Sequence, residues 1–184
     1  MSDAGLVLAA GEGRRFDGGT AKQLAPLRGR PLVEHALAAV RAELDRVVVV
    51  LGARAGEVRA GADLDGADVV VCPDWAEGLA ASVRCGLAAL AGADRVLVAL
   101  ADQPGLTPAA VRAVLARPGS ARAVYDGRPG HPVLLGPDLL ARAGELRGDA
   151  GFRELLDGVA AVECGRLGDP LDIDTREDLE MVER

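Results

Sequence analysis

The chain has 184 residues, a length that suits one α/β domain with a substantial core and is short for two. Hydrophobic residues make up 49% of it and aromatic residues only 2%, so valine, leucine and alanine must form the core. The formal net charge of −7 argues against a nucleic-acid-binding surface, which needs basic patches, but it does not exclude a small anionic ligand held by a few local charges.

No apolar run approaches the roughly 18 residues of a membrane span, and the first residues lack the charged start and cleavage site of a secretory signal. The three cysteines, Cys72, Cys85 and Cys164, are odd in number and widely spaced, with no metal-ligand pattern. We therefore expect buried thiols and a cytoplasmic protein that contacts neither a membrane nor nucleic acid.

Strands and helices are predicted to alternate along the chain. The apolar stretch 4–10 indicates a buried strand, and the apolar spacing within 31–44 indicates a helix. Further strands are expected at 46–52, 68–72, 95–102, 131–136 and 159–164, and further helices at 79–90, near 137–145 and 149–157, and at 175–184. Thr107 before Pro108 is typical of a helix start, as is Thr175 with Asp178 three residues later.

This alternation predicts a single-domain, Rossmann-like α/β fold with three layers (α/β/α) and a mostly parallel, twisted sheet. In such a fold, ligands bind at the carboxyl ends of the strands. The stretch after residue 10 and the acid at position 102 should therefore lie at the same edge of the sheet.

Residues 8–24, LAAGEGRRFDGGTAKQL, follow the first strand and are rich in glycine and positive charge. Backbone N–H groups of such a loop can surround phosphate oxygens, and Gly11 and Gly13 allow a ligand to approach closely. The motif G-x-G-x-x-G fails because Phe16 stands at the third glycine. The motif G-x-x-x-x-G-K-[S/T] fails because Lys22, the only lysine of the chain, is preceded by alanine and followed by glutamine.

The longer pattern LAAGEGRRF…KQL…GRPLVEHAL resembles the N-terminal signature of the MobA-like nucleotidyltransferases. The resemblance spans essentially the whole chain in the expected order, through EGLAASVRCGL (77–87), LVALADQPGLT (97–107), GRPGHPVLLG (127–136), GDAGFRELL (148–156) and DIDTREDL (172–179). Within this family, LAAG with the GHP and GDxGxR stretches is most similar to the molybdenum cofactor cytidylyltransferases. The guanylyltransferase relatives more often have a second glycine where Ala10 stands.

The resemblance implies where each ligand binds. Its nucleotide-binding residues are Leu8, Ala9, Ala10, Gly11 and Gly13 in the loop, Arg15 and Lys22 on the triphosphate, and Gly78 and Ser82 beside the base or ribose. Its acceptor-side residues are His131, Asp149 and Arg153. It also divides the domain into a nucleotide-binding half at about 1–106 and an acceptor-side half at about 107–184.

The resemblance further implies that Asp102 and Asp174 bind Mg²⁺, with Asp174 preferred to Asp172. Carboxylates from separate strand ends suit Mg²⁺, which takes its remaining ligands from phosphate and water. Taken alone, either aspartate could instead cap a helix or shape a turn. His131 could equally serve a structural role.

The expected activity is transfer of CMP from CTP, with Mg²⁺, to a phosphate-bearing acceptor, releasing pyrophosphate. Lys22, Arg15 and Asp102 would be the catalytic residues. The implied acceptor is molybdopterin carrying molybdenum, with a molybdoenzyme as client. The alternatives are GTP in place of CTP, another phosphorylated acceptor, or a non-catalytic protein that binds nucleotide or delivers a cofactor.

Overall fold

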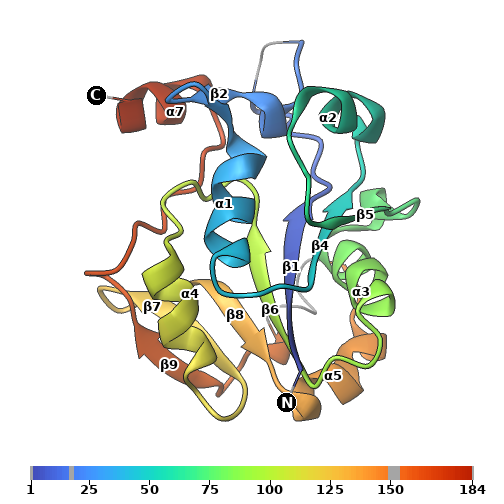
Figure 1. The fold of residues 1–184 in the computed structure, drawn as a ribbon, viewed down its shortest axis with the longest axis vertical. Helices are drawn as coiled ribbons and strands as arrows, with labels where there is room; N and C mark the ends of the chain where they lie inside the picture. Colours follow the sequence, from blue (N-terminus) through green and yellow to red (C-terminus); the bar gives the residue numbers. More distant parts are fainter. Residues whose placement is uncertain (1, 17–18, 149–153, 184) are drawn as a thin grey trace.

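A seven-stranded sheet forms the centre of the molecule in the computed structural model, which describes residues 2–16, 19–148 and 154–183 (Figure 1). Its strand order is β5-β4-β1-β6-β8-β7-β9. The strands are β1 (Asp3–Ala9), β4 (Val47–Leu51), β5 (Asp68–Val71), β6 (Arg95–Leu100), β7 (Ala121–Tyr125), β8 (Arg128–Leu135) and β9 (Ala160–Glu163). A separate hairpin pairs β2 (Pro26–Leu27) with β3 (Arg30–Pro31).

The strand directions place several functional segments at one edge. β1 pairs in parallel with β4 and β6, and β4 pairs in parallel with β5, so the carboxyl ends of these four strands lie together. β8 runs antiparallel to β6, which places the start of β8 at the same edge. The predicted single-domain fold with a mostly parallel sheet is confirmed.

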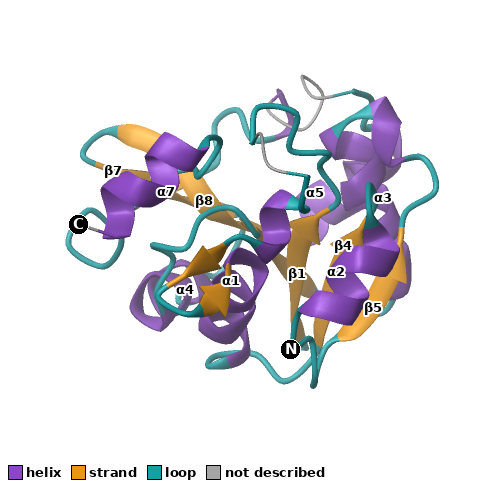
Figure 2. Ribbon diagram, turned by 90° about the horizontal axis from the view of Figure 1, so that it is seen from above, coloured by secondary structure: helices purple, strands orange, loops and turns teal. Residues whose placement is uncertain are grey.

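Helices cover both faces of the sheet, as the view from above shows (Figure 2). One face packs against α1 (Leu32–Arg41), α2 (Ala55–Gly61) and α4 (Pro108–Leu115), and the other against α3 (Leu79–Ala89) and α5 (Pro137–Arg142). The described residues also form three short 3₁₀ helices, η1 (Lys22–Leu24), η2 (Trp75–Glu77) and η3 (Ala143–Glu145), and a C-terminal helix, α7 (Arg176–Glu183). Among the helices of the described residues, none is both long and apolar enough to cross a membrane.

β1 illustrates how a central strand supports both layers. Successive side chains of a strand point to opposite faces. Accordingly, Val7 and Ala9 belong to the apolar cluster beneath α1 and α4, whereas Leu6 and Leu8 belong to the cluster beneath α3 and α5. A strand buried on both faces needs a nearly continuous apolar sequence, which is what made these strands predictable.

A third apolar cluster joins distant segments above the sheet edge. Phe16, Leu27 and Leu32 pack there with Ile173, and α7 covers the cluster with partly buried residues. Ile173, the only isoleucine, is fully buried, and its N–H donates a hydrogen bond of 2.9 Å to the backbone oxygen of Asp102. This packing places the segment before α7 beside the end of β6.

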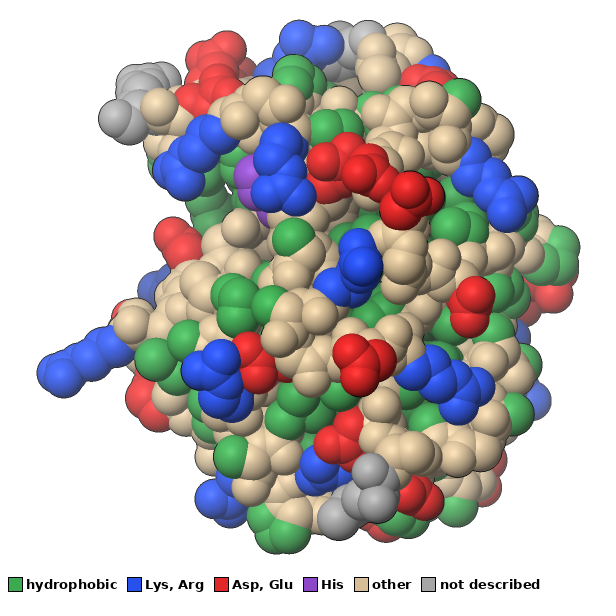
Figure 3. All heavy atoms as spheres, in the orientation of Figure 1, with side chains coloured by type: hydrophobic (Ala, Val, Ile, Leu, Met, Phe, Trp, Pro, Cys, Tyr) green, Lys and Arg blue, Asp and Glu red, His purple; other side chains and the backbone are tan. Residues whose placement is uncertain are grey.

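The charged side chains on the face seen in Figure 1 are of both signs and are interspersed (Figure 3). Among the described residues, several charged side chains form ion pairs, as Arg112 of α4 does with Glu43 at 2.6 Å. On this face, therefore, the excess of acidic residues is spread out rather than gathered into one patch.

Candidate active site

A cavity of about 570 Å³ opens at the carboxyl ends of β1 and β6. Its walls come from the loop after β1, η2, the start of α3 and the end of β6. The residues that line it are Leu8, Ala10, Gly11, Glu12, Gly13, Arg14, Arg15, Trp75, Ala76, Gly78, Leu79, Ser82, Leu100 and Asp102. A smaller cavity of about 70 Å³ shares part of this lining and adds Ala9, Lys22, Gln23, Leu32 and Ala101. Every residue predicted to bind the nucleotide therefore lines one of two adjoining cavities.

The two glycines of the loop have different physical reasons to be there. Gly13 has φ +67°, and a Cβ on it would lie 2.8 Å from the Cβ of Lys22, so a larger residue would be strained and would collide with the lysine stem. A Cβ on Gly11 would meet no atom within 4 Å. Gly13 is thus required by the fold, whereas Gly11 leaves open space beside the cavity.

Gln23 ties this loop to η1, and the sequence analysis missed it. Its Nε2 donates hydrogen bonds to the backbone oxygens of Ala9, at 2.9 Å, and Gly11, at 2.7 Å. The residue is only 5% exposed, so few water molecules could replace these bonds. The only signal in the sequence was a polar residue next to Lys22, which does not reveal its partners.

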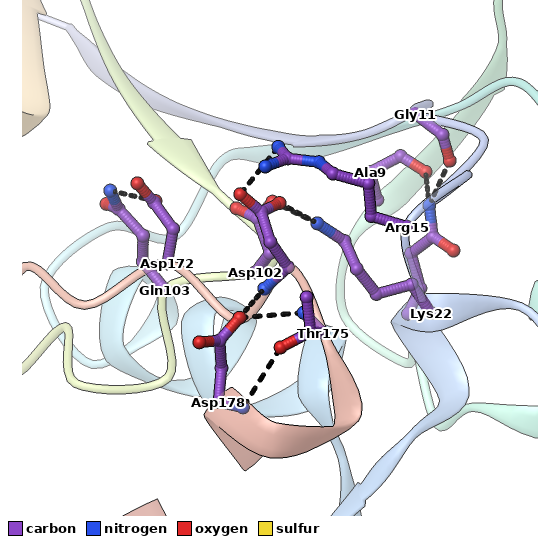
Figure 4. A network of polar contacts seen from close by, with 11 residues as sticks. Ala9, Gly11, Arg15, Lys22, Asp102, Gln103, Asp172, Thr175 and Asp178 are labelled. Atoms are coloured by element: carbon purple, nitrogen blue, oxygen red, sulfur yellow. Dashed lines mark hydrogen bonds and ion pairs between the residues drawn. The ribbon is translucent and has the colours of Figure 1, made fainter. Parts of the chain in front are cut away.

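Four charged side chains meet at the side of the cavity nearest β6. Lys22 Nζ donates to Asp102 Oδ2 at 2.6 Å and to Asp174 Oδ1 at 3.2 Å (Figure 4). Arg15 Nη2 donates to Asp174 Oδ2 at 2.7 Å. Two cations and two anions thus form one network that joins the glycine loop, η1, the end of β6 and the segment before α7.

The network keeps Lys22 protonated. Burial of this side chain by itself lowers the pKa of the ammonium, but the charges and hydrogen bonds of Asp102 and Asp174 outweigh burial and raise the pKa overall. Lys22 is therefore a permanent positive charge at neutral pH, in a pocket where only 9% of the residue is exposed.

Asp172 lies beside the network but has another partner. Gln103 Nε2 donates to Asp172 Oδ1 at 2.7 Å. Burial, together with the negative charges of Asp102 and Asp174, raises the pKa of Asp172, although the bond from Gln103 and the charge of Lys22 oppose this. Lys22 thus binds Asp102 and Asp174, whereas Asp172 binds Gln103.

The start of α7 fixes the position of Asp174. The backbone N–H groups of Asp174 and Thr175 donate to Asp178 Oδ2, at 2.9 and 2.7 Å. Asp178 N donates in return to Thr175 Oγ1 at 3.2 Å, which completes the capping arrangement expected from the sequence.

The donor set of Asp102 and Asp174 fits a divalent cation. The Lys22 ammonium, bound to both side chains, demonstrates that they can share a positive group. Within residues 2–16, 19–148 and 154–183, no group of three or more His, Cys, Asp and Glu side chains is placed to hold a metal ion. A metal here would therefore need further oxygens from water or phosphate, as Mg²⁺ commonly does.

Of the three residues predicted on the acceptor side, the structure describes only His131. His131 lies near the start of β8, at the same edge of the sheet, but it does not line either cavity. Burial, with a contribution from the charge of Arg122, lowers the pKa of His131 to about 4, so the ring is neutral at pH 7. Asp149 and Arg153 lie outside the described residues.

A glycine-rich loop after the first strand, a cavity of about 570 Å³ and two carboxylates, one after β6 and one before α7, are typical of an α/β protein that binds a phosphorylated ligand at this edge of its sheet. Residues 5–164 match the MobA-like NTP transferase domain family. The chain belongs to this family and is an enzyme of the nucleotidyltransferase class.

Three known proteins are similar to this chain in sequence or structure. Nicotine blue oxidoreductase of Paenarthrobacter nicotinovorans is 38% identical over 95% of this chain and 93% of its own length. A 2-C-methyl-D-erythritol 4-phosphate cytidylyltransferase of Ralstonia nicotianae is 41% identical over 58% of this chain and 46% of its own length. The structure of Rv0371c of Mycobacterium tuberculosis H37Rv in complex with manganese superposes with a TM-score of 0.82, at 32% identity, over 99% of this chain and 98% of that one.

Proposed function

We propose that this protein transfers CMP from CTP to a phosphate-bearing acceptor, with Mg²⁺, and releases pyrophosphate. The observation that carries the proposal is the network of Lys22, Arg15, Asp102 and Asp174 beside a cavity of about 570 Å³. It combines cations for phosphate oxygens with a carboxylate pair for a metal, at the strand ends where this fold binds its ligands.

The residues divide the work as follows. The loop from Leu8 to Gly13 and the cations Arg15 and Lys22 bind the triphosphate, and Gly78 and Ser82 lie beside the base or ribose. Asp102 and Asp174 hold Mg²⁺, which when bound supplies positive charge to the reacting phosphates. By the motif resemblance, the half from about residue 107 onward would bind the acceptor, with contributions from His131, Asp149 and Arg153.

This chemistry requires no covalent enzyme intermediate. A phosphate monoester has its second pKa near ~6, so it is mostly dianionic at neutral pH and can attack without a strong general base. The protein has to bring two anions into line and offset their repulsion. Arg15 and the buried Lys22 perform this task with fixed positive charges.

The choice of CTP rests on two observations, and the choice of acceptor rests on a third. Ala10, which distinguishes the cytidylyl signature, lines the cavity, and one relative is named a cytidylyltransferase. The molybdenum-carrying molybdopterin acceptor rests on the motif resemblance in residues 127–136 and 148–156. A client molybdoenzyme would then receive the product.

The decisive experiment measures pyrophosphate release under multiple turnover, with CTP, Mg²⁺ and molybdopterin acceptor, in wild type and in Asp102→Asn. We expect the substitution to keep the fold and to lower turnover by roughly 10²-fold or more, because an amide is a weaker Mg²⁺ ligand and removes one charge. Asp65→Asn removes an exposed carboxylate elsewhere and serves as the matched control. Full turnover in Asp102→Asn at saturating Mg²⁺ would refute the metal role. Nucleotide binding without pyrophosphate release would instead indicate a non-catalytic carrier.

A second candidate is a redox reaction, because the relative matched over nearly its whole length is named nicotine blue oxidoreductase. Incubating the protein with nicotine blue and a reduced nicotinamide dinucleotide tests this directly. Multiple turnovers of dye reduction, with no pyrophosphate released from CTP or GTP, would favour the redox function over nucleotidyl transfer.

A further inference from the structure

The oxygens expected to bind the metal already hold a cation in this structure. Lys22 Nζ lies 2.6 Å from Asp102 Oδ2 and 3.2 Å from Asp174 Oδ1, and Arg15 Nη2 lies 2.7 Å from the other oxygen of Asp174 (Figure 4). A divalent cation between the two aspartates would have to sit within contact distance of the ammonium. Two positive groups this close repel strongly in a partly buried site.

Charge balance leads to the same conclusion. The two aspartates are neutralised by Lys22 and Arg15, so a divalent cation entering alone would give the network a net positive charge. A triphosphate adds several negative charges next to the same two cations. The divalent cation and the triphosphate should therefore enter more readily together than either does alone.

The lysine can change partners without a change of fold. Its backbone lies in η1, where the adjacent Gln23 is bonded to the loop, and its Cβ lies against Gly13. The base of the side chain is thus fixed, while its flexible stem allows the ammonium group to swing. The cavity lined by Gly11, Gly13 and Lys22 lies directly beside it.

We propose that Lys22 occupies the metal position in the free protein and leaves it for the triphosphate, so that nucleotide and divalent metal bind cooperatively. This inference rests on the proposed function for the identity of the nucleotide. Lys22 therefore has two roles. In the absence of nucleotide it neutralises the charges of Asp102 and Asp174, and once nucleotide is bound it neutralises charge on the phosphates.

The first test measures Mn²⁺ binding by electron paramagnetic resonance in the absence of nucleotide. Wild type should bind Mn²⁺ weakly, and Lys22→Gln should bind it about 10-fold or more tightly, within the usual range of coupling between two ligands. Arg112→Gln removes a cation from a surface ion pair with Glu43 and should leave the Mn²⁺ affinity at the wild-type value. Equal affinities in wild type and Lys22→Gln would overturn the proposal.

The second test uses wild-type protein and does not depend on the folding of a variant. Because Lys22 is the only lysine, protein labelled with ¹⁵N at lysine Nζ gives one side-chain ammonium signal from this residue. Mg²⁺ alone, at a concentration sufficient for activity, should leave that signal unmoved, whereas Mg²⁺ with an α,β-methylene analogue of CTP should move it. A signal displaced by Mg²⁺ alone would show that the metal does not need the nucleotide, and would refute the proposal while leaving CMP transfer intact.

Discussion

The stem of Lys22 passes Gly13 and enters a site where only 9% of the residue is exposed, in a chain whose other side-chain cations, apart from histidine, are all arginines. An arginine ends in a broad planar fork, which suits bidentate pairing on a surface. A lysine ends in a compact ammonium on a slender stem, which can lie between two carboxylates and turn toward phosphate oxygens. The ammonium of Lys22, which contacts Asp102 and Asp174 at once, makes use of this compact end group.

Gln23 offers a test of loop positioning that leaves every charge in place. Gln23→Met keeps the size of the side chain but leaves the backbone oxygens of Ala9 and Gly11 without their donor. We expect a loss of about 1–3 kcal/mol in the free energy of unfolding, the usual cost of unsatisfied buried groups, measured by urea denaturation. We also expect the KM for the nucleotide to rise about 10-fold, while the KM for the acceptor stays unchanged.

The two KM values separate positioning from a general loss of structure. If Gln23 only stabilised the fold, Gln23→Met would lower the melting temperature without changing either KM at a temperature where the variant is fully folded. Gln23→Glu, which puts a carboxylate against two carbonyl oxygens, should impair nucleotide binding at least as much. Normal nucleotide KM in both variants would exclude the positioning role.

At the scale of elements, the sequence predicted the segments with a strong apolar pattern. The strands expected at 46–52 and 68–72 correspond to β4 (Val47–Leu51) and β5 (Asp68–Val71), and the helix expected at 79–90 corresponds to α3 (Leu79–Ala89). The strand expected at 95–102 ends earlier, at Leu100, and Asp102 lies in the turn that follows. β4 is buried throughout, and parallel strands buried on both faces produce apolar runs that are easily recognised. β5 lies at the edge of the sheet with exposed and half-buried residues, and was recognised by its run of valines.

The elements that the sequence did not predict have weaker patterns. β7 (Ala121–Tyr125) contains an arginine, and α2 (Ala55–Gly61) is a short run of small and charged residues with one fully buried side chain, Val58. The proximity of Asp174 to Lys22 also could not follow from spacing, because it depends on the packing of Ile173 in the third cluster. Here the family resemblance selected Asp174, whereas its neighbour Asp172 fits the bare sequence pattern equally well.

α7 gives a prediction about pH, because its first turn depends on the ionised form of Asp178. Hydrogen bonds from Thr175, and then from the backbone of Asp174, lower the pKa of Asp178 below its ordinary 3.8. The native state therefore prefers the ionised carboxylate, so its stabilising effect is fully present above pH 3.8 and is lost as pH falls through the lowered pKa. Asp178→Ala should lower the urea midpoint at pH 7, and the difference from wild type should shrink below pH 3.8.

Asp178→Ala should also change metal binding at the site. Without Asp178, the N–H groups of Asp174 and Thr175 lose their acceptor, so Asp174 is held less firmly. We expect the Mg²⁺ concentration needed for half-maximal turnover to rise in Asp178→Ala. A pH-independent stability difference, together with an unchanged Mg²⁺ requirement, would contradict this account of α7.

At the scale of the whole molecule, the proposed nucleotide-binding and acceptor-side halves share one core. The cluster beneath α1 and α4 contains Val7 and Val49 from the first half and Val111 and Leu134 from the second. β6 of the first half pairs with β8 of the second, in the middle of the sheet. A division of labour near residue 106 is therefore compatible with a single folding unit.

This shared core predicts that both halves unfold together. The chain has one tryptophan and one tyrosine, Trp75 at the nucleotide cavity and Tyr125 at the end of β7, so each half contains its own spectroscopic probe. In urea, Trp75 fluorescence and the ¹⁹F resonance of protein labelled with 3-fluorotyrosine at Tyr125 should report the same midpoint. Under the proposed function, CTP with Mg²⁺ would bind the native state only and should raise both midpoints equally, although Tyr125 does not line the nucleotide cavity. If the ligand shifted the Trp75 transition and left the Tyr125 transition in place, the halves would be separate cooperative units, and the shared core would not couple them.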